Sequence, residues 1–267
     1  ITQKNIKFLK NNNFNFIGPD LGDLACGESG DGRMSEPNAI YKYVVSKIKK
    51  KKIKLDILVT AGPTYEAIDP VRYIGNKSSG KQGIEIAKAF NKLGASVNLI
   101  LGPCKEDIPK DINTINIETA KDMLREIKKI DNIDIAICAA AVSDWTIDNP
   151  SNKKIKKHNS SKPKLNLSLN PDILEYIANK KDNRPQLVIG FAAETDNLIK
   201  NAQEKLEKKN CDWILANDVS KNPGIFGGDN NCISLVTKNN VDEWNICSKK
   251  EVAEKLANKV IESIESK

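Results

Sequence analysis

The sequence predicts an α/β protein whose mostly parallel sheet lies between two layers of helices. Two observations predict this fold class. From Leu55 onward, short apolar runs alternate with segments that have helical periodicity, and glycine, asparagine or proline marks the junctions between them. Strands that alternate with helices form parallel sheets covered on both faces. The 267 residues suffice for one large domain or for one domain and a fragment.

The first half of this pattern contains five elements. In chain order we expect a strand at 57–60, a helix at 79–93, a strand at 97–101, a helix at 119–130 and a strand at 135–138. The helix at 79–93 shows the periodicity well, because Ile84, Ala87 and Phe90 share one face. Gly94 is the expected stop of that helix.

The second half continues the alternation and ends in an antiparallel pair. We expect a helix from 170, a strand at 186–191, a helix at 196–209, a strand at 213–216, a hairpin of 232–237 with 241–246, and a final helix. Asn170 is the expected cap of its helix, with Pro171 at the first helical position. Ser248 and Glu251 form a capping box before the final helix. These elements predict a Rossmann-like three-layer sandwich with a C-terminal hairpin.

The first 54 residues have a different character. The chain begins at Ile1 within a helix-like pattern, and we expect this part to be the tail of a longer domain. Glycine is dense between Gly18 and Pro37, which predicts a loop or flap and no packed element. The run KIKKKKIK at 47–54 predicts a charged linker.

Composition excludes several classes of protein. The longest apolar stretch, 133–142, is too short for a membrane span of about 18 residues, and no signal peptide is evident. Six cysteines without a CxxC pair and a single histidine, His158, argue against a disulfide framework or a zinc site. We therefore expect a cytoplasmic protein with reduced thiols. The net charge of +7 attracts anions, either nucleic acid or a phosphorylated small molecule, or it reflects solvated surface lysines.

A loop rich in serine and glycine follows the first strand. Residues 75–83 nearly match the GxxxxGK[ST] phosphate loop, but Gln82 replaces the hydroxyl that binds magnesium, and the strand ends too far upstream. The GxGxxG dinucleotide fingerprint is also missing. Two interpretations remain for this segment, an anion-binding helix start and an ordinary capped helix start.

Two further segments have a functional and a structural interpretation. Small residues at 139–141 either admit a ligand close to the backbone or pack under a helix, and Asp144 either accepts from a ligand or magnesium or caps a turn. The cationic segment 153–157 either closes over a triphosphate or is solvated surface. The residues alone do not decide between these alternatives.

Ordered motifs at the strand ends resemble one enzyme family. They are the run from Leu58 to Pro103 that begins LVTAGPTYEAIDPVRYIGNKSSGKQG, then AAAVSDW, KIKK, NPDIL, GFAAET and LANDVS with GGDNN. From Leu55 to the end, the chain resembles phosphopantothenate–cysteine ligase, the second activity of a bacterial bifunctional coenzyme A biosynthesis protein. Residues 1–40, with ACGESGDGRM, resemble the last part of the flavin-dependent decarboxylase that precedes it. The resemblance predicts a decarboxylase remnant at 1–46, a linker at 47–54 and a ligase domain at 55–267.

The resemblance also implies a reaction and its partners. Phosphopantothenate, cysteine and CTP would be the small-molecule substrates, an acyl cytidylate the intermediate, and Mg²⁺ would accompany CTP. FMN would serve only the decarboxylase body that lies outside this chain. A homodimer formed through the ligase domain is implied, with the hairpin at 232–246 as one contact, and neither nucleic acid nor membrane is expected as a partner.

Site residues are carried over by matching motifs. Asn76 would stabilise the acyl cytidylate, Arg72 would contact phosphate or carboxylate, and Ala140 would line the substrate site. Lys154 would act in the second step or in closing over the intermediate, and Cys26 matches the proton donor of the decarboxylase. The implied CTP site consists of Cys138, Ala139, Ala140, Asp144, Lys154, Pro171, Asp172, Ile173, Leu174, Phe191, Lys205 and Lys209. Lys205 and Lys209 are four residues apart on a helix, so they share a face, and their repulsion is relieved if an anion lies between them.

Two other functions compete with the ligase. An NAD(P)-dependent oxidoreductase would use the same fold, but the chain lacks both the glycine fingerprint and a Tyr-x-x-x-Lys motif. A nucleic-acid-binding module would use the lysines of 47–54 and would bind with a steep dependence on salt.

Overall fold

The computed structural model describes residues 2–12, 14–23, 29–47, 53–156, 164–219 and 230–265. The chain divides into two compact units, Ile1–Lys51 and Lys52–Lys267. Cys26 and most of the lysine-rich linker lie outside the described residues, as does the end of the cationic segment from 157. Within the described part, no helix has both the length and the apolar content to cross a membrane.

The first unit contains two helices and a short ribbon. These are α1 (Thr2–Asn11), β1 (Asp20–Asp23), β2 (Ser29–Arg33) and α2 (Pro37–Lys47). The two strands pair antiparallel, with Gly22 opposite Gly30. The expectation of a loop at 18–37 was therefore partly wrong. Main-chain hydrogen bonds form this ribbon, and they need no apolar side-chain pattern that a sequence would display.

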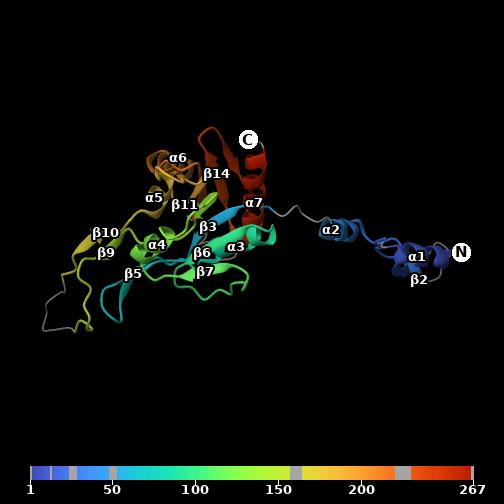
Figure 1. Ribbon diagram of the computed structural model, residues 1–267, viewed down its shortest axis with the longest axis horizontal. Coiled ribbons are helices and arrows are strands. Elements are labelled where there is room, and N and C mark those ends of the chain that lie inside the picture. The colour runs from blue at the N-terminus through green and yellow to red at the C-terminus, as the bar shows by residue number, and fades with distance from the viewer. Residues whose placement is uncertain are drawn as a thin grey trace. The chain divides into compact units, whose positions relative to one another are not determined.

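An eight-stranded sheet dominates the second unit (Figure 1). Its order is β15-β14-β12-β11-β8-β3-β6-β7. The strands are β3 (Asp56–Ala61), β6 (Ser96–Leu101), β7 (Asn113–Asn116), β8 (Ile135–Cys138), β11 (Leu187–Glu194), β12 (Trp213–Asp218), β14 (Ile233–Thr237) and β15 (Val241–Glu243). The strands from β7 to β12 run parallel, and β14 and β15 add an antiparallel hairpin at the edge. The predicted fold class is confirmed.

Helices cover both faces of this sheet. They are α3 (Lys81–Lys92), α4 (Ala120–Ile127), α5 (Ile173–Ala178), α6 (Leu198–Lys209) and α7 (Lys249–Glu265). Alternate residues of β3 enter different cores: Ile57 and Val59 pack with α3 and α7, whereas Leu58 packs with α4, α5 and α6. Because a central strand is buried on both faces, every residue of its run must be apolar or small. This two-sided burial explains why the sequence signal at 57–60 is so clear.

Short ribbons project from the connections of the sheet and were not predicted. They pair β4 (Tyr65–Ala67) with β5 (Tyr73–Gly75), β9 (Trp145–Ile147) with β10 (Leu167–Leu169), and β13 (Asn230–Asn231) with β16 (Cys247–Ser248). Strands of two or three residues are too short to show alternation, and the edge strand β7 has no apolar run.

One predicted helix start was wrong. Helix α5 begins at Ile173, and its cap is Asp172, whose Oδ1 accepts a hydrogen bond from the Glu175 amide at 2.8 Å. Asn170 instead donates its Nδ2 to the Ser143 carbonyl at 2.9 Å. Asn and Asp are equally good caps, and the tie of Asn170 to Ser143 decides between them. At the final helix, the predicted capping box of Ser248 and Glu251 is present.

Candidate functional site

The strand order creates a crevice at the carboxyl ends of the parallel strands. If the six parallel strands are numbered 1 to 6 along the chain, their order across the sheet is 3-2-1-4-5-6. The connections therefore diverge on either side of the neighbouring strands β3 and β8. Ligands of open α/β sheets bind at such a switch point. A cleft of about 970 Å³ lies here. Its lining includes Thr60, Asn76, 78–83, 138–145, 169–175, 191–193, Lys205, Lys208, Lys209, Asn217, Val219, Asn231 and Lys249.

Asn76 joins two walls of the cleft. It follows β5, and its Nδ2 donates to the carbonyls of Ala141 at 3.0 Å and Val142 at 3.1 Å. The segment after β8 is held from the other side as well, because the Ser143 amide donates to Thr64 Oγ1 at 2.9 Å. These contacts fix the small-residue segment after β8 beside the segment after β3.

The start of α3 approaches the end of β3 closely. Gly80 has φ +77°, and a side chain at Gly83 would put a Cβ 2.5 Å from the Cβ of Ala61. Glycine is required at both positions for these reasons. The cap residue Gly80 has no side chain to cap this helix, and the amides of Gly80 and Lys81 donate to Ser78 Oγ at 3.3 Å and to Ser79 Oγ at 3.5 Å. The positive end of the helix dipole and the two serines line the cleft. Such a helix start suits an anion.

The end of β8 and the segment after it form one wall of the cleft. The amide of Ala140 donates to Thr60 Oγ1 at 3.3 Å, and this bond holds the main chain at Ala140 next to the end of β3. Burial raises the pKa of the Cys138 thiol to about 12. The thiol is therefore protonated at neutral pH and acts as a small apolar group in the wall.

The two predicted lysines of α6 have partners within the protein. Lys205 Nζ donates to the Phe191 carbonyl at 2.8 Å. Lys209 Nζ pairs with Asp172 Oδ2 at 2.7 Å and with Glu175 Oε2 at 2.8 Å. Although partial burial opposes the charge, these two carboxylates raise the pKa of Lys209 above its ordinary value. The lysine repulsion noted from the sequence is thus relieved by the protein's own oxygen atoms.

Two of the predicted site residues that the structure describes, Arg72 and Lys154, do not line the cleft. Arg72 lies in the turn between β4 and β5 and is paired with the buried Asp69. Lys154 is exposed, and its neighbour Ile155 is bonded to that pair. Cys26 falls outside the described residues.

Sequence reasoning missed three asparagines of the cleft. The Oδ1 atoms of Asn170, Asn217 and Asn231 are buried and, within the described part of the chain, have no hydrogen-bond partner. Asn231 donates its Nδ2 to Gln82 Oε1 at 2.7 Å, and Gln82 donates to the Lys249 carbonyl at 3.1 Å. Because the Lys249 carbonyl only accepts, this chain of bonds sets the orientation of both amides. The motifs NPDIL, LANDVS and GGDNN contain these three residues, but a sequence does not indicate which amide oxygen stays without a partner.

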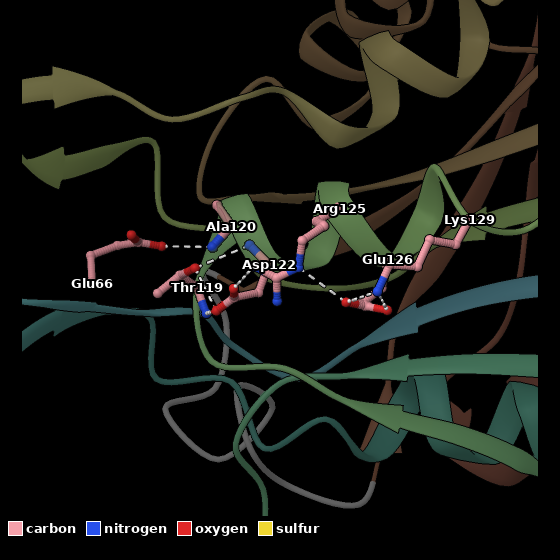
Figure 2. A network of polar contacts seen from close by, with 7 residues as sticks. All are labelled: Glu66, Thr119, Ala120, Asp122, Arg125, Glu126 and Lys129. Atoms are coloured by element: carbon pink, nitrogen blue, oxygen red, sulfur yellow. Dashed lines mark hydrogen bonds and ion pairs between the residues drawn. The ribbon is translucent and has the colours of Figure 1, made fainter.

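A polar network anchors the β4–β5 ribbon beside the cleft. The buried Glu66 of β4 accepts through Oε1 from the Ala120 amide at 2.9 Å, at the first residue of α4 (Figure 2). Thr119 and Asp122 complete a capping box at the same helix end. Both the ribbon and the start of α4 are thereby fixed.

The family of the chain follows from its sequence over most of its length. Residues 46–264 match the family described as the DNA/pantothenate metabolism flavoprotein C-terminal domain. The chain belongs to this family.

Relatives of the family agree with this assignment. The coenzyme A biosynthesis bifunctional protein CoaBC of Haemophilus influenzae is 43% identical over 98% of this chain and 66% of that protein. A protein named cysteine/cysteine sulfinic acid decarboxylase, from an unknown prokaryotic organism, is 41% identical over 97% of this chain and 74% of its own length. The crystal structure of a CoaBC C-terminal domain matches with TM-score 0.66 and 36% identity, over 80% of this chain and 97% of that domain. The chain thus spans about two thirds of the H. influenzae protein.

Proposed function

We propose that this chain joins cysteine to 4′-phosphopantothenate at the expense of CTP and gives 4′-phosphopantothenoylcysteine. One observation carries the proposal. The cleft at the switch point gathers every residue that the resemblance assigns to nucleotide or substrate, apart from Arg72, Lys154 and Cys26. These residues come from three separate connections of the sheet and from strands β8 and β11 themselves. Membership of a family whose relatives include CoaBC proteins supports the same function.

The chemistry requires an activated carboxylate. The carboxylate oxygen of phosphopantothenate attacks the α-phosphorus of CTP and expels pyrophosphate, which gives an acyl cytidylate. The cysteine amine then attacks the acyl carbon, loses a proton and expels CMP. Both steps develop negative charge on oxygen, which fixed amide donors and cations stabilise. The amide groups at the start of α3 and the lysines of α6 suit that task, whereas Asn76 uses its amide donors to hold the segment after β8 in place.

Magnesium fits this cleft as an ion carried by the nucleotide. No group of three or more His, Cys, Asp or Glu residues in the described ranges is arranged to hold a metal. The amide oxygens of Asn217 and Asn231, which have no hydrogen-bond partner among the described residues, are neutral ligands of the kind that hold a hydrated Mg²⁺ together with phosphates. Bound there, Mg²⁺ would neutralise the triphosphate.

Further proposals concern the longer protein. We propose that residues 1–46 belong to a decarboxylase part that would use FMN and convert the ligase product to 4′-phosphopantetheine, that 47–54 is a linker, and that 55–267 is the ligase domain. A cytoplasmic location stays a prediction. The oxidoreductase and nucleic-acid alternatives are not favoured, because the family match covers residues 46–264.

A homodimer is the oligomeric state that we propose. The β9–β10 ribbon exposes Trp145, Leu167 and Leu169, each more than half accessible, and Leu165 lies just before it. The hairpin at 232–246 offers one comparable side chain, Ile246. Several exposed apolar side chains on one short ribbon favour association with a second copy, so the ribbon is the better candidate for the contact, although Trp145 and Leu169 also line the cleft.

The activity is tested by following the two products separately. With phosphopantothenate and CTP, pyrophosphate should appear before cysteine is added, and CMP should follow only after addition. Asn76→Ala should lower pyrophosphate release by about 100-fold, because it removes the two hydrogen bonds that hold the segment after β8 in the wall of the cleft. Asn113→Ala, at the far edge of the sheet, is the matched control and should keep the wild-type rate. Release with ATP but none with CTP would overturn the nucleotide assignment, and release with neither would overturn the function.

A further inference from the structure

Asp69 is a buried carboxylate that the proposed reaction does not use. It lies in the turn between β4 and β5, and its side chain is fully inaccessible. Its Oδ1 accepts from the amides of Val71 and Arg72, both at 2.9 Å. Its Oδ2 accepts from Arg72 Nε at 3.0 Å and from the Ile155 amide at 3.1 Å, and also from Arg72 Nη2.

The two oxygens of Asp69 therefore have different tasks. Oδ1 shapes the local turn, whereas Oδ2 reaches a residue 86 positions later in the chain. Arg72 completes the connection, because its Nη2 donates to the Ile155 carbonyl at 3.1 Å. Both main-chain polar groups of Ile155 are thus held by one ion pair. Asp69, Arg72 and Ile155 are called the Asp69 clamp below.

The clamp fixes the cationic segment 153–157, at Ile155, in position relative to the wall of the cleft. Asn76, at the end of the same ribbon, is bonded to the segment after β8, and Glu66 ties the ribbon to α4 (Figure 2). The rings of Tyr65 and Tyr73 stack with centroids 3.9 Å apart, which stiffens the ribbon between these ties. Lys154 precedes Ile155 directly, so its main chain has a set position although its side chain is exposed.

We propose that Asp69 is a positioning residue that sets the place of Lys154 for the second half of the ligase reaction. This inference rests on the proposed function. It also changes the role of Arg72. The resemblance implies that the Arg72 guanidinium contacts a substrate phosphate or carboxylate, whereas in the structure it binds Asp69 and the Ile155 carbonyl. The carboxylate is suited to a permanent clamp, because its bonds to Arg72 hold the pKa of Asp69 well below its ordinary value of 3.8. It is therefore ionised wherever the enzyme works.

The substitution Asp69→Asn tests the clamp selectively. The amide keeps one acceptor for the turn but presents an NH₂ group to Arg72 and Ile155, which are themselves donors. We expect hydrogen exchange at the Ile155 amide to accelerate at least about tenfold. CMP release after cysteine addition should slow by about 10- to 100-fold, the usual cost of a misplaced group, while pyrophosphate release before cysteine stays within about twofold. Acyl cytidylate should accumulate.

Two companion variants separate positioning from a general structural role. Lys154→Gln should likewise slow CMP release and leave pyrophosphate release nearly unchanged. The double variant Asp69→Asn/Lys154→Gln should release CMP no more slowly than Lys154→Gln alone, because the clamp acts through Lys154. Glu66→Gln is the matched control, a buried carboxylate of the same ribbon whose amide form still accepts from Ala120. It should retain both steps. If Asp69→Asn fails to fold, Ile155→Pro removes the amide hydrogen that Ile155 donates to Asp69 and leaves Asp69 intact. It should slow CMP release but not pyrophosphate release.

The outcomes distinguish this inference from the function on which it rests. If the wild-type protein makes no acyl cytidylate, the proposed function fails. If wild type and Lys154→Gln behave as described but Asp69→Asn turns over normally, the positioning role alone is wrong. Equal losses in both steps, or an additive double variant, would also reject it, because they indicate a purely structural carboxylate.

Discussion

At the scale of single residues, two lysines of the cleft have partners inside the protein, Lys205 a main-chain carbonyl and Lys209 two carboxylates. Lys209 is only 16% exposed and sits between Asp172 and Glu175, so it ties the end of α6 to the start of α5. Lys208 is the next residue, lines the same cleft and is exposed. Lys208 and Lys209 thus differ in environment, and only the structure shows that Lys209 joins two helices through ion pairs.

Lys209→Met should lower stability more than the same change at Lys208. The substitution leaves two carboxylates of α5 without their shared cation, and we expect a loss of about 1–2 kcal/mol in the free energy of unfolding. Lys208→Met should change it by less than about 0.5 kcal/mol, as is usual at an exposed site. Urea unfolding followed by circular dichroism measures both. Equal effects of the two variants would show that the ion pairs of Lys209 add no stability.

At the scale of elements, α4 shows how a short helix is fixed at one end. Thr119 has the extended backbone of a cap, its Oγ1 accepts from the Asp122 amide at 3.1 Å, and Asp122 accepts from the Thr119 amide at 3.2 Å. Glu66 binds the next amide, that of Ala120 (Figure 2). Three of the first helical donors are therefore satisfied, which matters for a helix of eight residues that is marginal alone.

Thr119→Ala should cost about 1 kcal/mol of unfolding free energy, the usual value for a lost cap. Lys121→Ala, on the exposed side of the same helix, is the control and should be nearly neutral. Partial burial opposes the charge of Asp122, but its bonds to Thr119 and Arg125 hold its pKa below the ordinary 3.8. Because the folded pKa is the lower one, the carboxylate stabilises the protein above about pH 4 and loses this effect as pH falls further. The cost of Thr119→Ala should shrink over the same range, and a cost that does not change with pH would contradict the capping role of the carboxylate.

At the scale of the whole molecule, the connection from β8 to β11 serves both the cleft and the proposed association. Trp145 and Leu169 of the β9–β10 ribbon line the cleft, whereas Leu167 of the same ribbon is exposed outside the cleft and outside the two cores. Apolar side chains stay exposed on a ribbon at a cost that association removes.

Leu167→Asp should convert the proposed dimer to a monomer, because it places a charge within the apolar contact. Leu167 is 52% exposed and does not line the cleft, so the substitution spares the site. Ile246→Asp is the matched control at the other candidate contact and should leave the dimer intact. Light scattering over a range of concentrations measures the mass of each variant. A dimer that survives Leu167→Asp but not Ile246→Asp would place the contact at the hairpin near 232–246.

Much of the fold was predictable because its signals are local. The run at 57–60 is apolar at every position since β3 is buried on both faces, and the box of Ser248 and Glu251 marks the start of α7 within four residues. The helix start at Asn170 was wrong because two good caps lie two residues apart, and the contact of Asn170 with Ser143 decides between them. The two- and three-residue ribbons went unnoticed, because so short a strand has no pattern.

The sequence by itself determined the alternation of strands and helices and the family to which the chain belongs, because periodicity and motif order are properties of neighbouring residues. The tertiary structure alone decided which polar groups meet. The bonds of Asp69 to Ile155 and of Lys209 to Asp172 join residues far apart in the chain, and their existence depends on distances that only packing sets. For the same reason, only the packed structure shows that the amide oxygens of Asn217 and Asn231 have no hydrogen-bond partner among the residues that it describes.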